Sequence, residues 1–192
     1  MKKTSLIVLL SSMGTVFEWY DFTIYVYLSK VMSDLFFPNN DQRVSFLLYF
    51  TVFILSYLIR PLGGILFGYI GDRYGRKKVL FITLLTMTVS TLFMGLIPTY
   101  QEIGVLAPLA ILILRLAQGL SVGGEGIGAT TLIIESCEKG KSFLTSIIWA
   151  SSGVGILIAS LVATSLFLIF DSNQMLTFGW RMILPRKPVH QH

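Results

Sequence analysis

Long apolar stretches separated by short polar connections dominate the sequence. A helix that crosses about 30 Å of hydrocarbon needs about 20 apolar residues at a rise of 1.5 Å each. Five stretches meet this requirement, and they run approximately over residues 5–29, 44–70, 79–97, 104–128 and 142–170. The pattern therefore predicts an all-α integral membrane protein with five transmembrane helices and no separate soluble domain.

Composition supports this prediction and bears on the partners. Hydrophobic residues make up 54% of the 192 residues, charged residues 13%, and the mean hydropathy is +0.74, whereas soluble domains carry about 25% charge. The net charge of +5 does not indicate nucleic-acid binding, because the basic residues form short clusters between apolar runs, as the positive-inside rule expects. We predict the lipid bilayer as a partner, and no nucleic acid.

The N-terminus resembles a signal peptide, with Lys2 and Lys3 before the apolar run of residues 6–10. No pattern of small residues for cleavage follows, and the apolar character continues to Leu28. We therefore expect an uncleaved first membrane helix.

Near the C-terminus the apolar pattern stops early. Residues 178–184 begin to turn apolar, as a stub of a sixth helix would, but residues 185–192 contain two prolines and two cations. Such a segment cannot begin a membrane span. We expect a partial six-helix unit over residues 1–184 and an aberrant polar tail over residues 185–192.

The distribution of Lys and Arg predicts the orientation. One side of the predicted helices is strongly basic, whereas the loops of the other side carry Arg43, with Lys30 near a helix end. The basic tail would also fall on this second side, against the positive-inside rule. The basic side should be cytoplasmic, so we expect a multi-pass protein of the plasma membrane (cell inner membrane) with a cytoplasmic N-terminus. The residues of the basic side are Lys2, Lys3, Arg73, Arg76, Lys77, Lys78, Lys139 and Lys141.

Four charged residues fall deep inside the predicted helices, which is costly and therefore indicates function. Glu18 and Asp21 are three residues apart on one helix face, and Arg60 and Arg115 fall at a similar depth. They suggest a buried network around a cavity, in which a carboxylate binds and releases a proton and Arg115 tunes it or holds an anionic substrate group. The alternative is structural ion pairs that fix helix register. Pro61 favours a local helix distortion at Arg60, and Asp21 could reach the outer interface instead.

Small residues recur four positions apart, the spacing that lets helix backbones approach closely. In the fourth predicted helix the pairs are Gly119 with Gly123 and Gly124 with Gly128, and we interpret all four as helix-packing positions. Glu125 lies beside them, and we expect it near the cytoplasmic end, paired with loop cations.

The sequence contains no pattern of catalytic or metal-binding residues. Gly140-Lys141-Ser142 resembles the end of a phosphate-binding P-loop, but Glu135 stands where that motif requires its first glycine. We therefore expect no enzyme, no metal and no cofactor.

The connection between the second and third predicted helices carries the most specific motif. It reads Gly68-Tyr69-Ile70-Gly71-Asp72-Arg73-Tyr74-Gly75-Arg76-Lys77-Lys78, which resembles the major facilitator superfamily signature G-x-x-x-D-R-x-G-R-[RK] at the same place. Residues 115–119 are similar to the R-x-x-Q-G pattern of that superfamily. Three further stretches resemble its metabolite:proton symporter branch, and the proline/betaine transporter-like members most: residues 17–22, 60–64 and 118–125.

This resemblance implies a fold, a site and a coupling ion. The fold has two six-helix halves with the substrate at the midplane between them, and this sequence would form part of the N-terminal half. The residues implied in binding a small polar solute and coupling it to protons are Glu18, Asp21, Arg60, Arg115 and Gln118. The residues implied in a cytoplasmic gate are Gly68, Asp72, Arg73, Gly75, Arg76 and Lys77. For the gate residues the alternative is membrane anchoring and a tight turn.

Three functions stay open at this point. Alternating access needs two halves around one site, and five helices cannot supply them. We therefore expect a truncated proton-coupled symporter for a small polar metabolite, such as proline/betaine or a carboxylate, that is inactive alone. The chain could instead work with a separately encoded, missing C-terminal half or as a homo-oligomer. The third possibility is a non-transport membrane protein that binds or regulates an intact transporter.

Overall fold

The computed structural model describes residues 2–136, 140–177 and 179–180, and these contain helices but no strand. The expected tail at residues 185–192 and the stub of a sixth helix after Trp180 lie outside the described residues. The helices are α1 (Lys2–Tyr27), α2 (Ser29–Phe36), α3 (Gln42–Leu58), α4 (Arg60–Tyr74), α5 (Arg76–Leu96), α6 (Tyr100–Ile103), α7 (Leu106–Ser136), α8 (Lys141–Ile169) and α9 (Ser172–Thr177).

Four helical stretches in the described residues are long and apolar enough to cross a membrane. They are Gln42–Tyr74, Arg76–Leu96, Leu106–Thr131 and Lys141–Ile169, and each overlaps one of the stretches predicted from hydropathy. The first predicted stretch is covered by α1, whose 26 residues extend about 39 Å at 1.5 Å per residue. Helix α1 carries two carboxylates, Glu18 and Asp21, and is not among these four.

The second predicted helix is interrupted, and α3 and α4 meet at Ile59. Pro61 lies in the first turn of α4, where a residue without an N–H group is tolerated because that N–H would have no partner inside the helix. The Gly63 N–H donates to the Ile59 carbonyl at 3.2 Å, which continues the helix past the break. The interruption places Arg60 at the start of a new helix, in the middle of the span.

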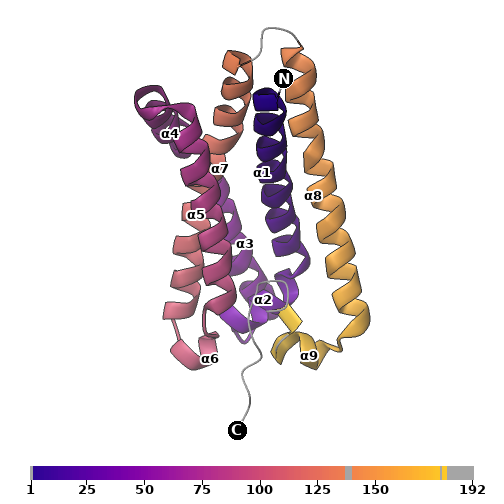
Figure 1. The fold of residues 1–192 in the computed structure, drawn as a ribbon. Helices are drawn as coiled ribbons and strands as arrows, with labels where there is room; N and C mark the ends of the chain where they lie inside the picture. The colour runs from indigo at the N-terminus through magenta and orange to yellow at the C-terminus, as the bar shows by residue number, and fades with distance from the viewer. Residues whose placement is uncertain (1, 137–139, 178, 181–192) are drawn as a thin grey trace.

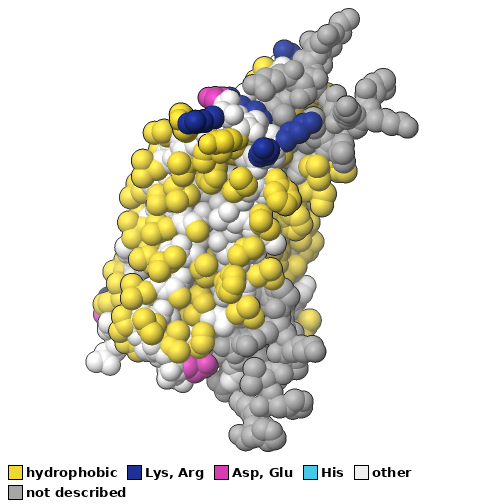
Figure 2. Space-filling model, turned by 60° about the vertical axis from the view of Figure 1, so that its left-hand side comes forward, with side chains coloured by type: hydrophobic (Ala, Val, Ile, Leu, Met, Phe, Trp, Pro, Cys, Tyr) yellow, Lys and Arg dark blue, Asp and Glu magenta, His cyan; other side chains and the backbone are white. Residues whose placement is uncertain are grey.

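The long helices lie side by side in one bundle (Figure 1). Helix α1 packs along α8, whereas α7 packs against α3, α4 and α5. The N-terminus, the turn between α4 and α5, and the start of α8 lie at one end, and α2, α6 and α9 lie at the other. Basic side chains cluster at the end with the N-terminus, and apolar side chains cover the flank below them (Figure 2). We call this end the basic end.

Glycines bring the backbones of α7 and the α3–α4 helix into contact. A Cβ atom added at Gly119 would lie 2.1 Å from the carbonyl oxygen of Ser56, and one at Gly123 would lie 2.0 Å from that of Arg60. Real Cβ contacts are never so short, so any side chain at these positions would push the helices apart. The close approach fixes the height of Arg60 relative to α7.

The other two predicted packing positions differ from each other. A Cβ atom at Gly124 would lie 2.4 Å from the Cβ of Phe67, which is again a close contact with α4. At Gly128 a Cβ atom would meet no described atom within 4 Å. Gly128 is buried, but the described residues show no close helix contact at this position.

The end opposite the basic end is closed by short helices that hydropathy did not predict. A short polar connection was expected between the first two stretches, residues 5–29 and 44–70, but α2 occupies part of it and buries Phe36. Trp180 packs edge-on against Phe36, with ring centroids 5.4 Å apart. An eight-residue helix is too short to cross a membrane, so a search for long apolar runs cannot find it.

Candidate functional site

A buried ion pair joins α1 to α7 near the middle of the bundle. Arg115 Nη1 donates to Asp21 Oδ2 at 2.7 Å, and the two side chains are 5% and 9% exposed. The adjoining cavity has a volume of only about 10 Å³, which is room for one water at most. Asp21 therefore lies inside the bundle and does not reach the outer interface.

Aromatic rings hold the guanidinium of Arg115 in place. It lies over the Tyr25 ring, 3.7 Å from the centroid. The Tyr25 ring stacks on Tyr49 of α3 at 4.1 Å, and the Tyr49 hydroxyl donates to the Tyr25 carbonyl oxygen at 2.7 Å. A cation over a desolvated ring gains about 2 kcal/mol, so this stack stabilises the buried guanidinium.

The second oxygen of Asp21 is reached from α5. The Thr91 hydroxyl lies 3.3 Å from Asp21 Oδ1, and Gln118 Nε2 donates to the Thr91 oxygen at 2.8 Å. Gln118 thus joins the network through a residue that the sequence did not single out. A lone threonine in an apolar helix gives no signal, because its hydroxyl can bond to its own helix instead.

A second ion pair lies one turn earlier on α1. Glu18 Oε1 is 3.7 Å from Arg60 Nη1, with side chains 13% and 20% exposed. The Arg60 guanidinium lies 4.5 Å from the centroid of Phe22 and 3.9 Å from that of Tyr57. Its Nε and Nη2 atoms have no hydrogen-bond partner among the described residues. This pair is more open than the Asp21–Arg115 pair.

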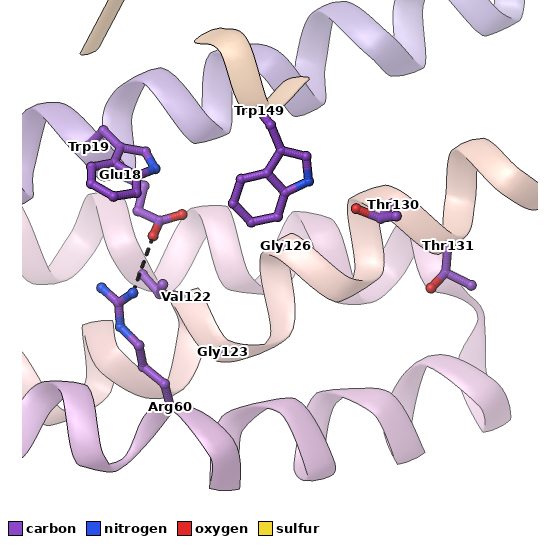
Figure 3. Close-up of a pocket in the computed structure, with 9 residues that line it drawn as sticks. All are labelled: Glu18, Trp19, Arg60, Val122, Gly123, Gly126, Thr130, Thr131 and Trp149. Atoms are coloured by element: carbon purple, nitrogen blue, oxygen red, sulfur yellow. Dashed lines mark ion pairs between the residues drawn. The ribbon is translucent and has the colours of Figure 1, made fainter. Parts of the chain in front are cut away.

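A cavity of about 450 Å³ opens beside the Glu18–Arg60 pair. Figure 3 shows the Glu18 carboxyl pointing at Arg60, with the indole rings of Trp19 and Trp149 nearby. The volume suits a small solute. Trp149 was not predicted, because one tryptophan in an apolar helix is usually a packing residue. The lining is completed by Val122, Gly123, Gly126, Thr130 and Thr131.

The predicted gate motif forms the turn between α4 and α5 at the basic end. Gly75 has φ of +97°, a conformation that favours glycine, and its N–H donates to the Gly71 carbonyl at 3.0 Å. Arg76 forms an ion pair with Asp72 one turn earlier. Because the Asp72 side chain is 69% exposed, this pair adds little to stability.

The other gate residues lie around this turn with different surroundings. Arg73 donates to the Tyr69 hydroxyl at 3.1 Å, and Lys77 is exposed. A Cβ atom at Gly68 would meet no described atom within 4 Å. The motif therefore presents a basic surface next to one sharp turn.

Glu125 lies in a different place from the one expected. Helix α7 continues to Ser136, about three turns past Glu125, so this residue is not near the helix end. Its side chain is 2% exposed and faces Gly14 of α1. The expectation that Glu125 lies near the cytoplasmic end and pairs with loop cations was wrong, because the glycines around it do not end the helix.

The fold and these intramembrane charges define a class of protein. A family model described as "Sugar (and other) transporter" matches residues 7–186. The chain belongs to this family, which is part of the major facilitator superfamily, and its relatives are transporters rather than enzymes. The superfamily resemblance predicted from residues 68–78 is confirmed.

Curated relatives narrow the similarity. The glycine betaine/proline/ectoine/pipecolic acid transporter OusA of Dickeya dadantii is 37% identical over 173 residues, which are 90% of this chain and 34% of the relative. The proline/betaine transporter of Escherichia coli K12 is 39% identical, with 90% and 35% covered. A putative proline/betaine transporter of Staphylococcus aureus (strain COL) is 38% identical over 183 residues, with 94% and 39% covered. The predicted proline/betaine transporter-like character is confirmed. The chain spans 34–39% of the length of these three relatives.

Solved structures share the fold at lower identity. The xylose transporter XylE of E. coli in an inward open conformation superposes with a TM-score of 0.76 at 20% identity, over 94% of this chain and 44% of that one. A crystal structure of a D-xylose-proton symporter gives 0.78 at 20% identity, over 92% and 43%.

Proposed function

We propose that this chain forms five membrane spans in the N-terminal half of a proton-coupled symporter for a small polar solute. The spans are α1, the α3–α4 helix, α5, α7 and α8. The proton is the coupling ion, and no other cofactor takes part. The observation that carries this proposal is the Glu18–Arg60 pair, a carboxylate and a guanidinium beside a cavity of about 450 Å³.

The difference between the two ion pairs assigns their roles. Binding a proton removes the charge of a carboxylate and weakens its attraction to a guanidinium, so proton occupancy biases which arrangement of helices is stable. Water and solute can reach Glu18 from the cavity, whereas Asp21 and Arg115 are almost dry. We assign proton coupling to Glu18 and the coupling between α1 and α7 to Asp21, Arg115 and Gln118.

The cavity lining supports a zwitterionic substrate. Indole rings attract cations, and Trp19 and Trp149 flank a carboxylate at Glu18. Arg60 also lines the cavity, where its guanidinium can attract a carboxylate. Three relatives are named as transporters of proline and betaine, which carry one cationic and one anionic group. We propose this substrate class for the intact transporter.

We also propose that the basic end is cytoplasmic and that Asp72, Arg73 and Arg76 form part of the gate there. The test uses single cysteines in a Cys137→Ser background, with Lys78→Cys at the basic end and Asn40→Cys at the other. Both positions are exposed. In intact cells we expect a membrane-impermeant maleimide to label Asn40→Cys only, and to label Lys78→Cys after permeabilisation. The reverse pattern would overturn the orientation.

Glu18→Gln tests proton coupling in a chimera in which this chain replaces the matching stretch of the E. coli proline/betaine transporter. The amide keeps the size of the side chain but cannot release a proton. We expect proton-driven accumulation of labelled proline to fall about 100-fold, the scale of losing one proton-transfer group. Exchange of proline across the membrane without a proton gradient should continue.

Glu102→Gln is the matched control, because Glu102 is an exposed carboxylate of α6, and it should accumulate proline like the parent chimera. Normal accumulation by Glu18→Gln would contradict the coupling role. A chimera that inserts but carries no proline would count against the symporter and favour a protein that binds an intact transporter.

A further inference from the structure

Glu125 is a buried acid that the site described above does not use. It is 2% exposed, and neither carboxyl oxygen has a hydrogen-bond partner among the described residues. A Cβ atom at Gly14 would lie 2.1 Å from Glu125 Oε1 and 2.9 Å from Leu84 Cδ2. The carboxyl group therefore fills the space that only a glycine at position 14 leaves open, between α1 and α5.

The charged group that faces Glu125 most directly is another carboxylate. Glu18 follows Gly14 by four residues, so it lies on the same face of α1, about 6 Å further along the helix. Helix α5 faces Glu125 with Leu84, and α8 approaches this turn of α7 with the Trp149 ring at Gly126. On α4, Arg60 is paired with Glu18.

An ionised carboxylate in this position would be unstable. Burying a charge without a partner costs several kcal/mol, and binding a proton removes the charge. Glu18 is close enough to exchange a proton with Glu125 after a rotamer change or through one water. From Glu18 the direction through Glu125 leads towards the basic end, because Gly14 is nearer the N-terminus of α1.

We propose that Glu125 is a second proton-binding residue, which holds a proton at rest, passes it along the α1–α7 interface towards the basic end and then takes up a new proton from Glu18. In this step an O–H bond of Glu18 breaks and its carboxylate pairs with Arg60. An O–H bond forms on Glu125, whose carboxylate becomes a neutral acid, so the net charge of the two residues does not change. The transfer step rests on the proposed symport, whereas proton binding by Glu125 does not.

Two readouts test the proposal. First, infrared spectra of the full chain in lipid vesicles at neutral pH should contain a carbonyl band of a protonated carboxyl group. Glu125→Gln should remove this band and Glu102→Gln should keep it. Gly14→Ala should shift it, because the new Cβ displaces a flexible side chain without touching backbone. Second, Glu125→Gln in the proline chimera should lower proton-driven accumulation about 100-fold and leave proline exchange intact.

The outcomes separate this proposal from the symporter assignment. A band that survives Glu125→Gln overturns proton binding, and full accumulation by Glu125→Gln overturns the transfer. If the symporter assignment itself fails, Glu18→Gln has no effect on accumulation while the infrared band still disappears with Glu125→Gln. Gln has the size of Glu and no charge to bury, so the variant should fold at least as well as the parent.

Discussion

Asp21→Asn is expected to destabilise the chain by about 3–5 kcal/mol, the cost of removing one partner of a buried ion pair. Asn keeps the size of Asp, so the change removes charge and little else. It leaves the Arg115 guanidinium buried at 5% exposure, and the Tyr25 ring and the Thr91 hydroxyl cannot replace a full negative charge. The measurement is the free energy of unfolding of the chain in mixed micelles as the fraction of dodecyl sulfate rises.

The double variant Asp21→Asn with Arg115→Gln separates attraction from burial. With both charges absent, no unpaired charge is left in the bundle, so the double variant should be more stable than either single variant. The control is the corresponding pair of changes at Asp72 and Arg76. Because that ion pair is exposed, its loss should lower the free energy of unfolding by less than about 1 kcal/mol. Additive losses in the Asp21–Arg115 cycle would show that the pair does not stabilise the chain electrostatically.

From the sequence, only the shared depth of the four charged residues could be predicted, and not which of them pair. Counting residues at 1.5 Å per residue gives the depth of Glu18, Asp21, Arg60 and Arg115, but it does not give the direction in which each side chain points around its helix axis. The structure pairs Asp21 with Arg115 and Glu18 with Arg60. That choice depends on the packing of α7 against α1 and α4, which no single helix encodes.

Hydropathy placed the end of α7 too early, and the surroundings of Glu125 and Gly128 were therefore predicted incorrectly. The glycine-rich stretch after Gly119 looks like a helix end, because isolated glycines weaken helices by about 1 kcal/mol each. Here contacts with α3–α4 outweigh that cost, and the helix continues to Ser136. As a result Glu125 is buried away from the helix end, without the loop cations expected to pair with it, and a Cβ atom at Gly128 would meet no described atom within 4 Å.

The superfamily signature was more informative than hydropathy, because its residues need particular chemistry at fixed spacing. Gly75 has a positive φ in the connection between α4 and α5. Asp72 and Arg76 flank this connection and are four residues apart, the spacing of an ion pair. The cavity lining by Trp149 and the threonines of α7 had no such spacing. Those residues come together only when α8 packs along α1.

The last prediction concerns two of the four α7 glycines. Replacing each with alanine should change the stability of the chain in opposite directions. Gly123→Ala places a Cβ atom 2.0 Å from the carbonyl oxygen of Arg60, and Gly128→Ala places one more than 4 Å from any described atom outside its own stretch of helix. Backbone cannot move aside as a side chain can, so Gly123→Ala should separate α7 from α4 and cost about 3 kcal/mol. Gly128→Ala should be neutral or stabilising by up to about 1 kcal/mol, because alanine favours the helix.

Unfolding of both variants in the same mixed micelles measures this difference directly. Gly123→Ala should also shift the height of Arg60 relative to Glu18, so the proline chimera carrying it should lose accumulation and exchange together, unlike Glu18→Gln. If the two alanine variants were equally stable, the close contact between α7 and α4 would be wrong. The helices would then be held at the ordinary distance of about 8–10 Å by their side chains, and the pairing of Arg60 with Glu18 would need another explanation.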